Sequence, residues 1–88
     1  VMHAATKVLN GHSDAVAGVL AGARADGFWH RLVAIRKNQG AILGPFEAYL
    51  LLRGMRTLHL RTAAQAQSAL DLAQRLSSHP HVARVLYP

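Results

Sequence analysis

The stretch that decides the fold stands at the start of the chain and reads VMHAATKVLNGHSD, residues 1–14. Residues 1–4 are mostly apolar, which is typical of the end of a buried strand. Residues 5–14 contain Asn-Gly and Ser-Asp, which favour turns and indicate a loop. The run from Ala15 to Gly22 is apolar and bounded by turn residues, so it predicts a strand buried on both faces. We therefore expect a strand, a polar loop and a second strand.

Two helices are expected after this loop. Asp26 is placed to cap the first helix with its carboxylate, and Gly40 marks the end of that helix. Pro45 is expected in the first turn of the second helix, where its missing amide hydrogen does no harm. Gly54 interrupts or ends that helix.

The longest helix is predicted from about residue 57 to residue 77. Four small side chains and a leucine recur along one side of it at spacings of four and three residues, at Thr62, Ala66, Ala69, Ala73 and Leu76. This narrow seam would let another helix or a sheet approach closely. Pro80 stops the helix, and residues 82–87 predict a final strand. The order of these elements predicts an α/β fold.

Composition narrows the classes of function. Ten Lys and Arg oppose four Asp and Glu, but the basic residues are spread along the chain and aromatic residues are few. That distribution is unlike a nucleic-acid binder, so we expect no nucleic-acid partner. The longest apolar stretch, Ala15 to Ala23, is far below the ~20 residues of a membrane span, so we expect no membrane partner. The absence of cysteine excludes a disulfide scaffold and fits a cytoplasmic protein.

The ends of the chain suggest an internal piece of a longer protein. The sequence begins at Val1 rather than Met, ends directly after an apolar run, and is 51 % hydrophobic. A small chain with this much hydrophobic sequence either has a dense core or lacks the partner surface against which it would pack. We expect the 88 residues alone to be inactive and poorly stable.

Lys7 is the candidate reactive residue. Most lysines are solvated surface residues, and that interpretation applies here as well. Against it, Lys7 follows a predicted strand end, precedes a glycine-containing polar loop, and has the hydroxyl of Thr6 beside it. A partly desolvated lysine at such a place can form a Schiff base, and a neighbouring hydroxyl can bind a phosphate.

Several separate motifs resemble one enzyme family. They are HAATKVLNGHSD at residues 3–14, GAILGP at 40–45, LLRGMRTLHLR at 51–61 and HPHVARVLYP at 79–88. In this order they resemble the Cys/Met-metabolism pyridoxal-phosphate enzymes, whose lysine segment reads His-Ser-x-Thr-Lys-Tyr-x-x-Gly-His-Ser-Asp. The family includes cystathionine gamma-synthase, cystathionine gamma-lyase and methionine gamma-lyase. The resemblance covers all 88 residues, which are a minority of the family's usual length.

The resemblance implies a segment of a fold-type-I pyridoxal-phosphate transferase. Residues 1–57 would be the C-terminal part of the large cofactor-binding domain, including the end of its sheet. Residues 58–80 would be the linking helix, and residues 81–88 would begin the small C-terminal domain with its first strand.

The resemblance also implies the site. Lys7 matches the lysine that holds pyridoxal 5'-phosphate and then acts in catalysis, and Thr6 matches a hydroxyl that binds the cofactor phosphate. Ala4 stands where the family usually has a phosphate-binding serine, which removes one charge-assisted hydrogen bond worth about 1.5–3 kcal/mol. Val8 replaces the tyrosine that usually follows the lysine, and we assign it no catalytic role. The acid at the pyridine nitrogen, the stacking aromatic and the carboxylate-binding arginine are expected outside this segment.

The implied reaction makes or breaks a carbon–sulfur bond in methionine biosynthesis, cysteine metabolism or another transsulfuration step. The implied substrate is a small sulfur amino acid or an activated homoserine, and the implied parent enzyme is a homotetramer. The motifs are common to gamma-synthases, gamma-lyases, beta-lyases and sulfhydrylases.

Two further interpretations come from the residues themselves. His3, His12 and Asp14 match no metal-binding spacing, so we expect them to shape the loop and expect no metal. The alternative function is a small basic α/β module that binds nucleic acid or a protein partner and is related to the family only by ancestry.

Overall fold

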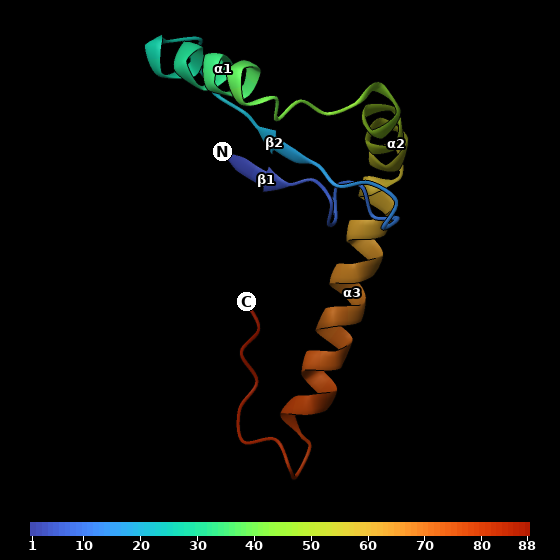
Figure 1. Cartoon of the computed structure of the whole chain (residues 1–88). Helices are drawn as coiled ribbons and strands as arrows, with labels where there is room; N and C mark the ends of the chain where they lie inside the picture. Colours follow the sequence, from blue (N-terminus) through green and yellow to red (C-terminus); the bar gives the residue numbers. More distant parts are fainter. The chain divides into compact units, whose positions relative to one another are not determined.

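The computed structural model describes residues 1–88, which form three helices and a two-stranded sheet (Figure 1). The chain divides into two compact units, Val1–Arg56 and Thr57–Pro88. The prediction of a mixed α/β composition is therefore confirmed. None of the helices combines the length and the apolar character needed to cross a membrane.

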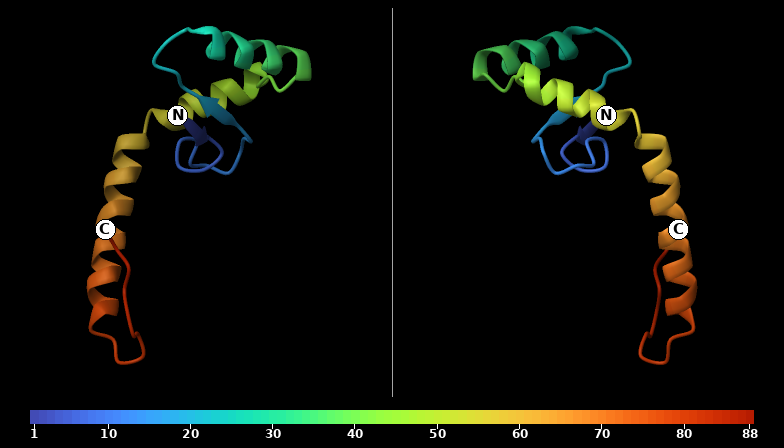
Figure 2. Two further views of the ribbon diagram at one scale, coloured as in Figure 1. Left: turned by 90° about the vertical axis from the view of Figure 1, so that its left-hand side faces the viewer. Right: turned by 90° about the vertical axis from the view of Figure 1, so that its right-hand side faces the viewer.

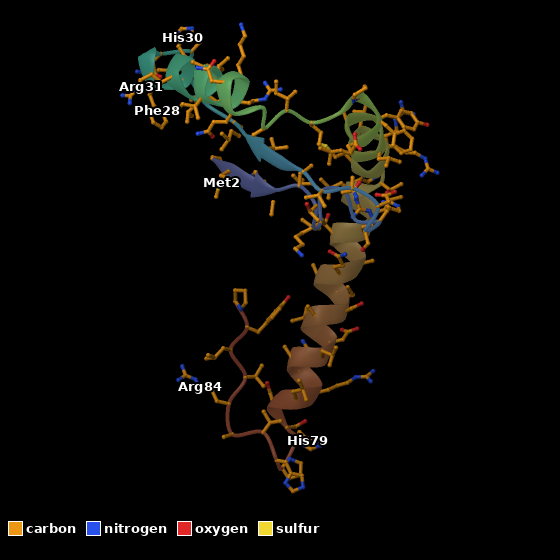
Figure 3. All side chains as sticks on the ribbon, in the orientation of Figure 1. Met2, Phe28, His30, Arg31, His79 and Arg84 are labelled. Atoms are coloured by element: carbon orange, nitrogen blue, oxygen red, sulfur yellow. The ribbon has the colours of Figure 1, made fainter.

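The sheet is a hairpin at the start of the first unit. Strand β1, Met2–Ala4, pairs antiparallel with β2, Gly18–Leu20, so that His3 lies opposite Val19. Both strands lie within the predicted ranges, and most of their residues are exposed in these 88 residues rather than buried on both faces. Met2 is 79 % exposed and its side chain projects from the hairpin (Figure 3). A strand is buried on both faces only where further layers cover the sheet, and this pair of short strands lacks such cover.

Helix α1, Gly27–Gln39, begins and ends as the sequence predicts. The Asp26 carboxylate accepts a hydrogen bond from the Trp29 amide at 2.9 Å, and Gly40 adopts the left-handed conformation with φ 70°. The Trp29 ring packs so closely on Gly22 that a Cβ there would lie 2.9 Å from its Cε3. The exposed side chains Phe28, His30 and Arg31 project from the helix (Figure 3).

Helix α2, Pro45–Met55, starts with its proline in the first turn, as predicted. Gly54 lies in the last turn, one residue before the helix ends, and it is buried. Leu51, one turn earlier, is also buried. The buried side of the last turns of α2 therefore faces the rest of the first unit.

The core of the first unit joins α2 to the hairpin and its loop. Its buried members are Ala5 from the loop, Ala17 before β2 and Leu51 from α2. Leu9, Val19 and Leu43 pack against them and remain partly exposed. Small side chains make this core thin, so its stability depends on close contact rather than on a large buried area.

The second unit contains helix α3, Leu58–Ser77, which matches the predicted long helix. The segment after Pro80 runs back beside α3 in both views of Figure 2, and the Tyr87 hydroxyl donates a 3.4 Å hydrogen bond to the Ala66 carbonyl. The predicted strand over residues 82–87 was wrong, because these residues form no strand. A strand needs a partner for its amides, and this unit contains no other strand. Ala66 belongs to the small-residue seam, but this unit contains no second helix or sheet that could pack on the seam.

We predict that the 88 residues alone show no cooperative thermal melt. Only four hydrophobic side chains are buried, Ala5, Ala15, Ala17 and Leu51, whereas large apolar side chains on all three helices are exposed. So little buried apolar area cannot offset the conformational entropy of ordering this chain. Differential scanning calorimetry measures the transition, and a sharp melt with a large enthalpy would contradict the prediction.

Candidate active site

Lys7 lies in the turn that follows β1, and its main chain is fixed on both sides. Its amide donates to the Ala4 carbonyl at 3.1 Å, and its carbonyl accepts from the Gly11 amide at 2.8 Å. The Lys7 side chain is exposed. The Lys7 amine can therefore reach solvent, and the backbone that carries it has little freedom to move.

Thr6, the second predicted site residue, bridges the two arms of the loop. Its hydroxyl accepts a hydrogen bond from the Ala17 amide at 2.9 Å and lies 3.3 Å from the Ala17 carbonyl oxygen, to which it donates. Its amide also donates to that carbonyl at 3.1 Å. Thr6 and Ala17 thus extend the β1–β2 pairing beyond the strands and close the loop that carries Lys7.

Polar side chains hold the far end of the loop. The Asn10 side-chain amide donates to the Asp14 carboxylate at 2.7 Å, and the His12 Nδ1 lies 2.7 Å from the Asn10 carbonyl oxygen. His12 and Asp14 therefore shape the loop, as expected from the sequence. The structure brings together no group of three or more side chains that could hold a metal ion.

Two residues of the loop have left-handed backbones, Gly11 with φ 76° and Ser13 with φ 58°. Glycine adopts this conformation without strain, whereas for a serine it costs about 1–2 kcal/mol. The bonds made by His12 and Asp14 on either side of Ser13 offset that cost. The loop is therefore held in one conformation by its side chains.

Only part of this arrangement could be recognised from the sequence. Thr6 and Lys7 are part of a recognisable sequence motif. Ala4, which stands where the family usually has a phosphate-binding serine, is exposed at the end of β1. Asn10 was interpreted only as a turn residue, yet it is completely buried. Gly54 was interpreted as a helix breaker, yet it contacts Asn10. An asparagine beside a glycine gives no local signal of burial, so only the tertiary contact identifies these two residues.

A shallow pocket lies on one side of α2. Its lining comes from residues spaced three, four and seven positions apart, which share one helical face: Tyr49, Leu52, Arg53 and Arg56. The pocket contains two cationic side chains and none of the residues of the lysine loop. We assign it no part in the chemistry of Lys7.

The comparison with known proteins identifies the family. The model of the Cys/Met metabolism PLP-dependent enzyme family matches residues 1–88. The chain belongs to this family. The resemblance carried by its motifs is thereby confirmed.

The curated relatives of the chain include both lyases and a synthase. It is 44 % identical to the cystathionine gamma-lyase of Dictyostelium discoideum and 48 % identical to the L-methionine gamma-lyase of Streptomyces avermitilis. It is 40 % identical to a probable cystathionine gamma-synthase of Herpetosiphon aurantiacus. Each match covers all 88 residues of this chain but only 21–27 % of the relative. The chain thus spans about a fifth to a quarter of the length of the relatives it matches.

We predict that Thr6→Val opens the loop and that Thr6→Ser does not. Valine keeps the shape of threonine but leaves the Ala17 amide without its acceptor, which costs about 1–3 kcal/mol for a buried group. Hydrogen exchange at the Ala17 amide in the folded protein measures this opening. Equal exchange rates in the valine and serine variants would show that the hydroxyl does not close the loop.

Proposed function

We propose that this chain supplies the cofactor-lysine segment of a PLP-dependent enzyme that makes or breaks a carbon–sulfur bond in sulfur amino acid metabolism. The observation that carries this function is the Lys7 geometry, an exposed amine on a backbone fixed at both its amide and its carbonyl. Family membership supports the cofactor. The relatives' names, which include gamma-lyases, a beta-lyase and a probable gamma-synthase, support the carbon–sulfur chemistry.

The residues present fit this cofactor. An exposed primary amine suits covalent attachment to the aldehyde of PLP. A hydroxyl has one proton to donate and two lone pairs to accept with. The Thr6 hydroxyl uses one lone pair for the Ala17 amide, and its bond to the Ala17 carbonyl is long at 3.3 Å. A phosphate oxygen could take that proton while the Ala17 amide bond, which closes the loop, remains.

The roles of the residues follow from their chemistry. PLP, when bound, supplies an electron sink for charge on the substrate carbons. The Lys7 Nζ would act as a base that moves protons at the α- and β-carbons of the substrate. The Thr6 hydroxyl would orient the phosphate group of the cofactor. The fixed main chain of Lys7 limits the positions from which its amine can act, which favours one path for the proton.

The proposed enzyme takes a small sulfur amino acid or an activated homoserine as substrate. Within it, residues 1–57 belong to the large cofactor-binding domain of a fold-type-I transferase. Residues 58–80 form the linking helix, and residues 81–88 begin the small domain. We propose that the complete enzyme is a cytoplasmic homotetramer, like the family that the motifs resemble.

We predict that borohydride reduction of the complete enzyme with PLP labels Lys7. Reduction traps the bond between the cofactor and the lysine that holds it, and peptide mapping by mass spectrometry locates the label. The Lys7→Ala variant should lose turnover but keep its fold, because an exposed side chain contributes little packing. A label on Lys37, the other lysine of the chain, would refute the assignment.

We also predict that Ala4→Ser tightens PLP binding by about tenfold or more. The added hydroxyl would make one charge-assisted hydrogen bond to the cofactor phosphate, worth about 1.5–3 kcal/mol. Titration of the cofactor-free enzyme with PLP measures the affinity. The strand should tolerate the change because Ala4 is exposed. An unchanged or weaker affinity would show that Ala4 does not face the phosphate.

A further inference from the structure

The contact between Gly54 and Asn10 joins helix α2 to the lysine loop. Gly54 is buried in the last turn of α2, and a Cβ placed on it would overlap the Asn10 carbonyl oxygen. That Cβ would also lie 3.0 Å from the Asn10 carbonyl carbon and 3.2 Å from its Cα. These are backbone atoms, which cannot swing aside as a flexible side chain could. Only a glycine therefore allows the helix to approach the loop this closely.

Asn10 is bonded to both ends of the loop that carries Lys7. Its amide donates to the Ala5 carbonyl at 2.9 Å, and its side chain donates to the Asp14 carboxylate at 2.7 Å. Asn10 is fully buried, so its side of these bonds is shielded from water, whereas Asp14 is exposed. The next residue, Gly11, donates its amide to the Lys7 carbonyl at 2.8 Å. A displacement of Asn10 is thus transmitted to the backbone of Lys7 through one short hydrogen bond.

The glycine is unfavourable for the helix itself. Inside a helix, glycine loses more conformational freedom than alanine and lacks its methyl group. The close approach to Asn10 explains its presence in α2, where an alanine would suit the isolated helix better. Replacing Gly54 by a larger residue therefore has two opposing effects. It raises the helix propensity of α2, and it makes the new side chain overlap the backbone of the loop.

We propose that Gly54 and Asn10 are positioning residues that set where the Lys7 amine stands relative to the cofactor. This role rests on the proposed function of Lys7. The loop backbone packs against helix α2, and Gly54 sets the distance between them. The Asn10–Asp14 hydrogen bond keeps the loop from shifting. Neither residue needs to touch substrate or cofactor.

The Gly54→Ala variant of the complete enzyme tests this role. The overlap must shift the loop, and a misplacement of a reacting group by about 1 Å can reduce a rate by about a hundredfold. We expect kcat to fall by about tenfold to a hundredfold while KM changes little. The absorbance band of the cofactor bound to Lys7 should change as well. In the cofactor-free protein, hydrogen exchange at the Asn10 and Gly11 amides should become faster.

The matched control is Gly27→Ala at the first residue of α1, where a Cβ would meet nothing within 4 Å. This variant should keep the kinetics, the absorbance band and the exchange rates of the unsubstituted enzyme. A folded Gly54→Ala variant with unchanged kcat and absorbance would overturn the role of Gly54. Failure of borohydride to label Lys7 in the unsubstituted enzyme would instead refute the proposed function, so the two failures are distinguishable.

A second pair of variants tests the Asn10–Asp14 bond and remains informative if Gly54→Ala does not fold. Asn10→Asp removes the donor and places two carboxylates side by side, so kcat should fall and the absorbance band should change. Adding Asp14→Asn returns a donor to the pair with its direction reversed, and should restore most of kcat and the original band. A folded double variant that is as impaired as Asn10→Asp would overturn the role of this bond in positioning Lys7.

Discussion

The hydrogen bond from the buried Asn10 side chain to the Asp14 carboxylate is the constraint on which the lysine loop depends. The buried amide group of Asn10 needs a hydrogen-bond partner, and the carboxylate of the exposed Asp14 is a strong acceptor for it. The bond ties the start of the turn to its far end, across the left-handed residues Gly11 and Ser13. Because the loop is closed in this way, the exposed Lys7 side chain projects from a well-defined backbone.

The small core has a direct consequence for stability. Ala5 and Ala17 bury little apolar area, so the first unit depends on short polar contacts such as those of Thr6 and Asn10. Meanwhile, α1 and α3 contain no buried residues and expose apolar side chains such as Phe28 and Leu60. Apolar surface of this kind is stabilised when it is covered. The relatives are four to five times longer than this chain, which gives them far more surface with which to cover it.

The position of Gly54 shows how a residue that weakens a helix can serve the fold as a whole. The helix loses propensity at this residue, and the first unit gains a contact that brings α2 against the loop backbone. Local preference and tertiary packing therefore disagree here. Such disagreements are expected at functional or strained sites rather than at random positions in a fold.

The sequence by itself determined the family and the helix ends. The motifs around Lys7 are continuous in the chain, and the Asp26 cap and the proline at Pro45 act on residues within one turn of themselves. Tertiary structure alone decided which side chains are buried, that residues 82–87 form no strand, and that Gly54 meets Asn10. The physical reason is the same in each case. Burial and strand pairing depend on partners distant in the sequence, and local residue patterns do not specify those partners.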